Sequence, residues 1–82
     1  MSALSDAARE RIRGIVAEHL CCKPAQVFDH SHLFDELGCD SLDVIEIGIA
    51  MEEEFDINAI PDDDVEKWRT VADIQASVAA AA

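Results

Sequence analysis

Residues 33–55 read LFDELGCDSLDVIEIGIAMEEEF, and their second part carries the strongest helix signal in the chain. From Ser41 to Phe55, apolar side chains recur at a period of about 3.6 residues. Asp40 directly precedes this run, and its carboxylate can accept from backbone N–H groups that a first helical turn leaves unpaired. We therefore predict a helix over 41–55, with Ser41 exposed in its first turn.

The sequence before residue 41 predicts one helix and a long loop. A 3.6-residue stripe of apolar side chains covers residues 7–20, and Ser5 or Asp6 is placed to cap its first turn. Pro24 disfavours helix at the residue before it, and the stretch to Asp40 mixes turn formers with spaced apolar residues. We expect a long ordered loop, in which one helical turn fits.

Two further helices are predicted after residue 60. Pro61 suits the first position of a short helix that reaches about Trp68, because three aspartates follow it. Thr70 and Asp73 form a T-x-x-D cap for a last helix, whose alanine-rich end we expect to fray over residues 77–82. The predicted fold class is all-α: a small four-helix bundle of three main helices and one short helix. Residues 1–82 are expected to form a single domain.

The charge balance restricts the partners. Eighteen acidic residues face six Lys and Arg, which gives a formal net charge of −12. Nucleic acids and anionic membranes should repel such a chain, basic proteins should attract it, and like charge favours a monomer. No apolar run approaches the roughly 20 residues of a membrane span. Three cysteines, two of them adjacent, suit free thiols in the reducing cytoplasm.

The helix predicted over 41–55 has two apolar faces. One arc is expected to pack in the core, and it comprises Val44, Ile47, Gly48, Met51 and Phe55. Near the opposite side lie Leu42, Ile45 and Ile49, among carboxylates. This second strip indicates a docking surface, although scattered exposed apolar residues are ordinary in proteins. Gly48 indicates either close helix packing or space for a buried ligand.

Ser41 lacks the surroundings of a catalytic serine. The candidate bases are His19, His30 and His32, and no spacing places any of them beside it. The G-x-S-x-G elbow of serine hydrolases is also absent, so we predict that the chain is not an enzyme. Ser41 is either a plain first-turn residue or a modified one, whose helix N-terminus favours a phosphodiester.

The sequence also allows a weak hypothesis of a metal-binding site. Soft or borderline ligands gather between residues 21 and 39, namely Cys21, Cys22, His30, His32 and Cys39. The paired spacing of common structural zinc sites is missing, which favours free thiols and loop histidines. The acidic run 62–64 lacks the glycine and terminal glutamate of an EF-hand. We therefore predict no specific metal site.

Residues 37–43, Leu-Gly-Cys-Asp-Ser-Leu-Asp, resemble the signature of acyl carrier proteins. The acidic run 52–56, the Ile-Pro-Asp turn at 60–62 and Thr70-Val71 extend the resemblance over most of the chain. It implies that a phosphopantetheinyl transferase moves phosphopantetheine from coenzyme A onto Ser41. The arm's thiol would then hold acyl groups as thioesters and deliver them to acyl-loading and synthase enzymes of fatty-acid, specialised lipid or polyketide synthesis.

The resemblance also implies roles for two further sets of residues. Positions that meet basic docking patches on partner enzymes are Asp40, Leu42, Asp43, Ile45, Glu46, Ile49, Glu52 and Glu53. Positions that line an acyl pocket in relatives, or simply belong to the core, are Leu33, Gly48, Met51, Phe55, Ile60 and Trp68. The docking positions agree with the second apolar strip found from the helical period alone.

Several residues depart from the family's common pattern. Cys39 stands where alanine is frequent, Gly48 where valine is frequent, and Trp68 where a smaller aliphatic residue is usual. These differences favour a specialised carrier over one for bulk fatty-acid synthesis. A different class of function also fits the residues: an unmodified acidic adaptor that binds basic proteins through the same helix.

Overall fold

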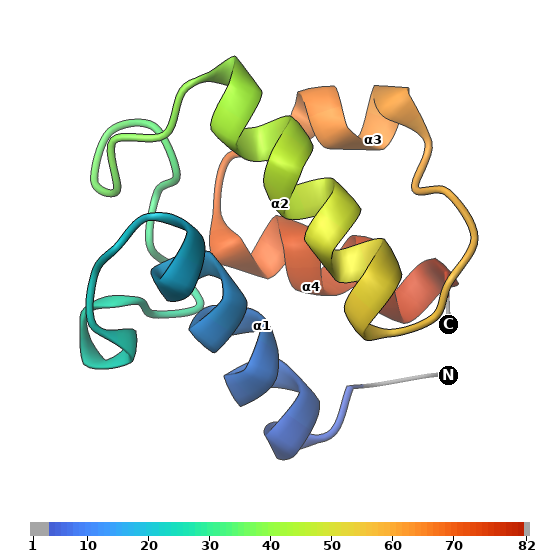
Figure 1. The fold of residues 1–82 in the computed structure, drawn as a ribbon, viewed down its shortest axis with the longest axis horizontal. Coiled ribbons are helices and arrows are strands. Elements are labelled where there is room, and N and C mark those ends of the chain that lie inside the picture. The colour runs from blue at the N-terminus through green and yellow to red at the C-terminus, as the bar shows by residue number, and fades with distance from the viewer. Residues whose placement is uncertain (1–3, 82) are drawn as a thin grey trace.

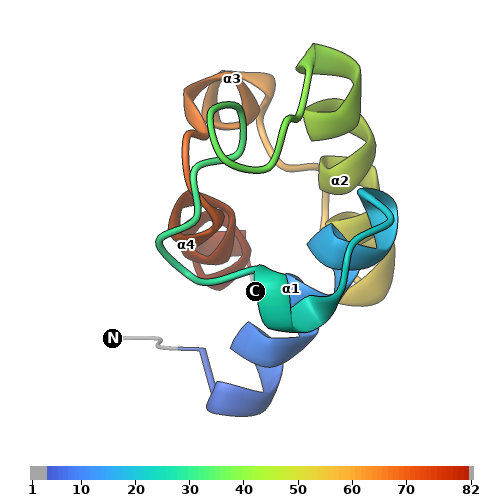
Figure 2. The same ribbon diagram turned by 90° about the vertical axis from the view of Figure 1, so that its left-hand side faces the viewer.

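The computed structural model describes residues 4–81, and within them the chain is helical (Figure 1). The elements in chain order are α1 (Asp6–His19), the 3-10 turn η1 (Pro24–Gln26), α2 (Ser41–Glu54), α3 (Asp62–Lys67) and α4 (Val71–Ala81). In Figure 2, α2 and α4 lie on opposite sides of the interior, with α3 above α4 and α1 below. This confirms the predicted all-α fold of three main helices and one short helix.

The ends of α1, α2 and α3 lie within one residue of the prediction. The Ser5 hydroxyl accepts from the Ala8 N–H at 3.1 Å, so Ser5 and not Asp6 is the N-cap of α1. Phe55 is the C-cap of α2, one residue beyond its last helical position. Pro61 is the N-cap of α3 and not its first helical residue, because its ψ of 138° is extended.

The last helix begins as predicted. The Asp73 carboxylate accepts from the Thr70 N–H at 3.0 Å, and the Thr70 hydroxyl accepts from the Asp73 N–H at 3.4 Å. The helix α4 runs through Ala81, and fraying over residues 77–82 stays a prediction. Buried Val78 and the Ser77 hydroxyl, which accepts from the Trp68 indole N–H at 2.8 Å, hold this segment. Residue 82 lies outside the described residues.

The long loop between α1 and α2 is held against the segment that connects α3 to α4. The Leu33 N–H donates to the Arg69 carbonyl at 2.8 Å, and the Val71 N–H donates to the Ser31 carbonyl at 3.1 Å. His32 and Thr70 form an isolated antiparallel bridge in the same place. The expected helical turn is η1. These contacts fix the path of the loop, which ends where α2 begins at Ser41.

The core lies between α1, α2, α4 and the loop. The largest fully buried side chains come from each of these parts, and they include Ile12, Leu33, Ile47, Trp68 and Ile74. The predicted core face of α2 is buried, except that its last member, Phe55, is half-buried. The Arg11–Glu54 ion pair (2.7 Å) also joins α1 to α2 at the surface.

Candidate functional site

Ser41 is the first residue of α2, and a reciprocal pair of hydrogen bonds fixes this helix end. The Asp40 carboxylate accepts from the Asp43 N–H at 2.9 Å, and the Asp43 carboxylate accepts from the Asp40 N–H at 3.0 Å. This capping box satisfies two of the donors that the first turn would leave unpaired. The Ser41 side chain is exposed. The helix end is therefore rigid, while the serine that it presents is accessible.

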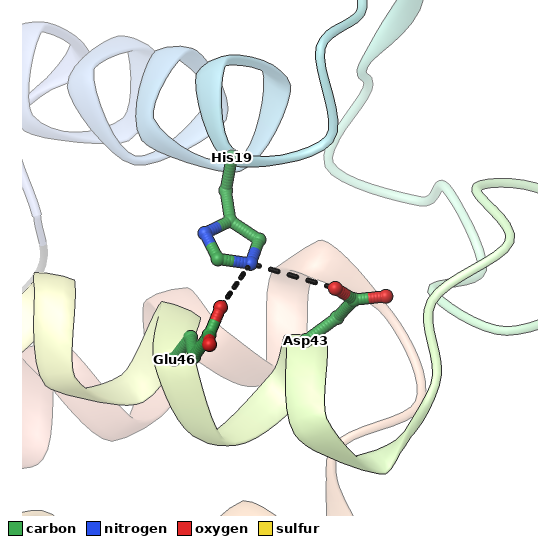
Figure 3. Close-up of side chains that lie close together, drawn as sticks. All are labelled: His19, Asp43 and Glu46. Atoms are coloured by element: carbon green, nitrogen blue, oxygen red, sulfur yellow. Dashed lines mark ion pairs between the residues drawn. The ribbon is translucent and has the colours of Figure 1, made fainter.

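The contacts of the histidines argue against activation of Ser41. His19 faces Asp43 and Glu46 (Figure 3), and the ring of His30 stacks on Phe28 with centroids 5.5 Å apart. The His32 Nδ1 accepts from the Asp35 N–H at 3.1 Å. Among residues 4–81, no side chain forms a hydrogen bond with the Ser41 hydroxyl. A nucleophilic serine requires a hydrogen-bonded base, and the described contacts supply none.

The surroundings of Ser41 fit a phosphate that is covalently attached better than a free phosphate that is bound non-covalently. The helix dipole and the N–H groups of the first turn favour an anion at this end. However, the carboxylates of Asp40 and Asp43 lie at the same end, and the net charge of −12 repels free phosphates. A phosphate on Ser41 would therefore depend on its covalent bond, with the helix end providing secondary stabilisation.

A cavity of about 270 Å³ opens beside Ser41. It lies between α2, α3 and the long loop, and its lining comprises Phe34, Ser41, Val44, Ile45, Val65 and Glu66. Apolar side chains form most of the wall, and Ser41 is among the lining residues. The cavity is thus suited to an apolar group that is attached through Ser41.

The residues expected to line an acyl pocket lie deeper than this cavity. Leu33, Gly48, Met51, Ile60 and Trp68 are buried in the core, and Phe55 is half-buried. None of the six lines the cavity beside Ser41, where the apolar wall comes from other residues. Sequence reasoning missed Phe34 and Val65, because their place beside α2 depends on how the loop and α3 pack.

The glycine in α2 is not forced by close helix packing. A Cβ atom added to Gly48 would lie 3.7 Å from Cη2 of Trp68 and 3.8 Å from a Val65 methyl, which are ordinary van der Waals distances. The Trp68 ring therefore covers the face of α2 that the glycine leaves bare. Val65 is also part of the cavity wall, so it contributes both to the cavity and to the cover over Gly48.

The second face of α2 presents an apolar ridge to solvent. The exposed fractions are 62% for Leu42, 52% for Ile45 and 50% for Ile49, and all three are large apolar side chains. The carboxylates around the ridge differ in their contacts. Glu53 is exposed, whereas Glu52 accepts from the Ile60 N–H at 2.6 Å and so holds the α2–α3 loop. The ridge is accessible, and some of its acidic rim is already engaged.

The three cysteines between residues 21 and 39 differ in their exposure. Cys21 is exposed, Cys22 is half-buried and Cys39 is buried, and all three are free thiols. Burial, together with the nearby carboxylates of Asp43 and Asp40, raises the pKa of the Cys39 thiol to about 11. In the described part of the chain, the only group of three or more metal-capable side chains is His19, Asp43 and Glu46. Sequence reasoning missed His19 at this place.

Comparisons with known proteins agree with this geometry. The family model described as "Phosphopantetheine attachment site" matches residues 10–78. The chain is 53% identical over 70 residues to the acyl carrier protein of Zymomonas mobilis subsp. mobilis, covering 85% of this chain and 87% of that protein. It is 52% identical over 64 residues to the acyl carrier protein of Caulobacter vibrioides, covering 78% and 81%.

A solved structure supports the fold, and the relatives support the family. The solution structure of the apo doublet acyl carrier protein from prodigiosin biosynthesis superimposes with a TM-score of 0.77 at 19% identity, covering 89% of this chain. This chain spans 35% of that protein, and at this identity the likeness concerns the fold alone. Separately, no helix within residues 4–81 has the length and apolar character needed to cross a membrane. The family model and the relatives together show that the chain belongs to the acyl carrier proteins, which carry phosphopantetheine.

Proposed function

We propose that Ser41 is the residue that carries phosphopantetheine, and that the chain is a carrier without catalytic activity of its own. The observation that carries this proposal is the display of Ser41: an exposed hydroxyl on the first residue of a helix whose end is fixed by Asp40 and Asp43. A transferase needs to reach this hydroxyl from solvent. The capping box fixes the backbone of the helix end from which Ser41 projects.

The residues around Ser41 would then position the group and its cargo. When bound, phosphopantetheine supplies a terminal thiol that holds an acyl group as a thioester. The apolar wall formed by Phe34, Val44 and Val65 would shelter part of an apolar chain from water. Val65, which forms part of this wall, also lies over Gly48 together with Trp68.

The ridge of Leu42, Ile45 and Ile49 is the proposed contact surface for partner enzymes. Apolar area at its centre would supply affinity, and the surrounding carboxylates would steer encounter with Lys- or Arg-rich patches. The phosphopantetheinyl transferase and the acyl-loading and synthase enzymes would use overlapping parts of this surface, since each needs access to Ser41. A monomer in the reducing cytoplasm, with three free thiols, fits this use.

Intact-mass spectrometry tests this proposal directly. The purified chain is incubated with coenzyme A and a phosphopantetheinyl transferase of broad specificity, and its mass is followed over time. The expected result is a gain of one phosphopantetheinyl group in the native sequence and none in Ser41→Ala. A matched control is Ser77→Ala, which removes a hydroxyl that bonds Trp68 far from this helix end. A gain that persists in Ser41→Ala would overturn the proposal.

A further inference from the structure

Three side chains from two helices converge near the start of α2 (Figure 3). The Nε2 atom of His19, the last residue of α1, lies 3.5 Å from an Asp43 carboxylate oxygen and 3.2 Å from a Glu46 carboxylate oxygen. The three donor atoms all lie within 4.8 Å of one another. They therefore surround a single point between α1 and α2.

The spacing of these atoms matches the ligand shell of a small divalent cation. Zinc binds imidazole nitrogen and carboxylate oxygen at about 2.0–2.2 Å, so two ligands at the tetrahedral angle lie about 3.4 Å apart. The two separations measured from His19 Nε2 lie on either side of this value. The third separation, between the two carboxylates, is at most 4.8 Å, so Asp43 and Glu46 would move toward each other to share one ion.

The hydrogen bonds around Asp43 position it as a ligand. Its Oδ2 accepts from the Asp40 N–H at 3.0 Å, which leaves Oδ1 directed toward His19. Such outer contacts orient metal ligands and strengthen binding. Asp43 and Glu46 are three residues apart on α2, so they share a face of the helix. His19 and Asp43 side chains are 22% and 32% exposed, whereas Glu46 is 49% exposed, which leaves one side open to water ligands.

We propose that His19, Asp43 and Glu46 form a site for one divalent transition-metal ion of the zinc type. Imidazole nitrogen favours zinc, nickel or cobalt, while magnesium and calcium prefer shells made of oxygen alone. The ion would join the end of α1 to the start of α2, two residues from Ser41. It would also neutralise Asp43 and Glu46, so partner docking would weaken; this last consequence rests on the proposed function, and metal binding does not.

An ion-pair bridge from a protonated His19 to the two carboxylates would explain the same contacts without a metal. The experiment must therefore distinguish metal binding from such a bridge. Chelator-washed apo protein is titrated with zinc chloride in a calorimeter, and in parallel arms with magnesium chloride. To remove the competing thiols, all proteins used in the calorimeter carry Cys21→Ser and Cys22→Ser, since Cys21 is exposed near the end of α1. One zinc ion per chain is expected, with no measurable displacement by magnesium.

Single substitutions assign the ligands. His19→Gln and Glu46→Gln should each weaken zinc binding about tenfold or more and remove the zinc-induced rise in melting temperature. The control is His32→Gln, because His32 faces only one carboxylate, Asp35, at 3.8 Å. That variant should bind as the parent does. Circular dichroism confirms that each variant is folded before titration.

Cobalt gives an independent readout of the ligand atoms. A cobalt complex of the protein with native cysteines should lack the charge-transfer band that thiolate ligands produce. Three outcomes would overturn the proposal: no heat of binding at millimolar zinc, equal zinc affinity in the parent and His19→Gln, or a thiolate band in the cobalt spectrum. None of these measurements depends on whether Ser41 carries phosphopantetheine. A negative result for the metal site would therefore leave the proposed carrier function unaffected.

Discussion

The indole of Trp68 covers Gly48, with its Cη2 atom 3.7 Å from the position that a Cβ atom on Gly48 would take. The same indole donates a hydrogen bond to the Ser77 hydroxyl of α4 at 2.8 Å. The Trp68 side chain, which is hydrogen-bonded to α4, therefore fills the space beside α2 at the position of Gly48. Gly48 and Trp68 are therefore complementary in shape, since the ring occupies the side of α2 on which the glycine has no side chain.

Gly48→Ala is expected to stabilise the protein. Alanine is favoured over glycine in a helix interior by about 1 kcal/mol, and the new methyl group would contact Trp68 at an ordinary distance. The matched control is Gly14→Ala in α1, where an added Cβ meets nothing within 4 Å. Denaturant unfolding should show gains of about 1 kcal/mol in both, with the larger gain at Gly48. A loss of stability in Gly48→Ala alone would indicate that the indole needs the full space.

Cys21→Gly should also raise stability. Cys21 has a φ of 57° and follows the C-cap of α1, where the Cys22 N–H donates to the Ala17 carbonyl at 2.9 Å. This Schellman motif requires a residue in the left-handed backbone conformation. For a residue other than glycine, that conformation lowers stability by about 1 kcal/mol. Cys21→Ala is the control, because alanine keeps the strain while removing the thiol. If both variants unfold at the same denaturant concentration, the strain is not the cause.

Asp29 is expected to make stability fall at acid pH. Hydrogen bonds from Gln75 (2.8 Å) and then from Arg13 (2.6 Å) lower the pKa of this carboxyl below its ordinary value. Its stabilising contribution is therefore complete above the unfolded pKa of about 3.9 and is lost as pH falls through the lower folded pKa. Asp29→Asn should be less stable than the parent at neutral pH. Urea unfolding should show this difference shrinking below about pH 4.

A charge reversal on the ridge's rim tests the docking surface. Glu53→Lys should slow phosphopantetheine transfer and reduce its dependence on salt, because a steering carboxylate is replaced by a repelling charge. Glu53 is preferred to Glu52, whose hydrogen bond to Ile60 would confound stability with docking. The control is Glu10→Lys, an equal charge change on an exposed position of α1. If both variants slow the transfer equally, the net charge of the protein and not a docking surface controls the rate.

Local patterns predicted the elements, because each helix start is fixed by residues adjacent in sequence. Asp40 before α2 and the Thr70–Asp73 pair before α4 form the expected caps. The exposed ridge of α2 also follows from the helical period. Sequence reasoning did not give the loop's path, since it depends on distant contacts such as the hydrogen bond from Leu33 to Arg69.

The site was predicted less completely than the fold. Ser41 was predicted from its position and its surrounding motif, and its role stays a prediction. The position of His19 beside Asp43 depends on how α1 packs against α2. No spacing in the sequence encodes that contact. The cavity wall was missed for the same reason: Val65 reaches it from α3, while Trp68 turns inward to bond Ser77.

The most direct measurement of the central claim is peptide mapping by tandem mass spectrometry of the protein isolated from its native cell. The account predicts one phosphopantetheinyl group, located on Ser41, in the peptide that spans the start of α2. It also predicts that every other serine is unmodified by this group. A protein that is fully active in acyl transfer while Ser41 is unmodified, or one that carries the group on another residue, would contradict the account.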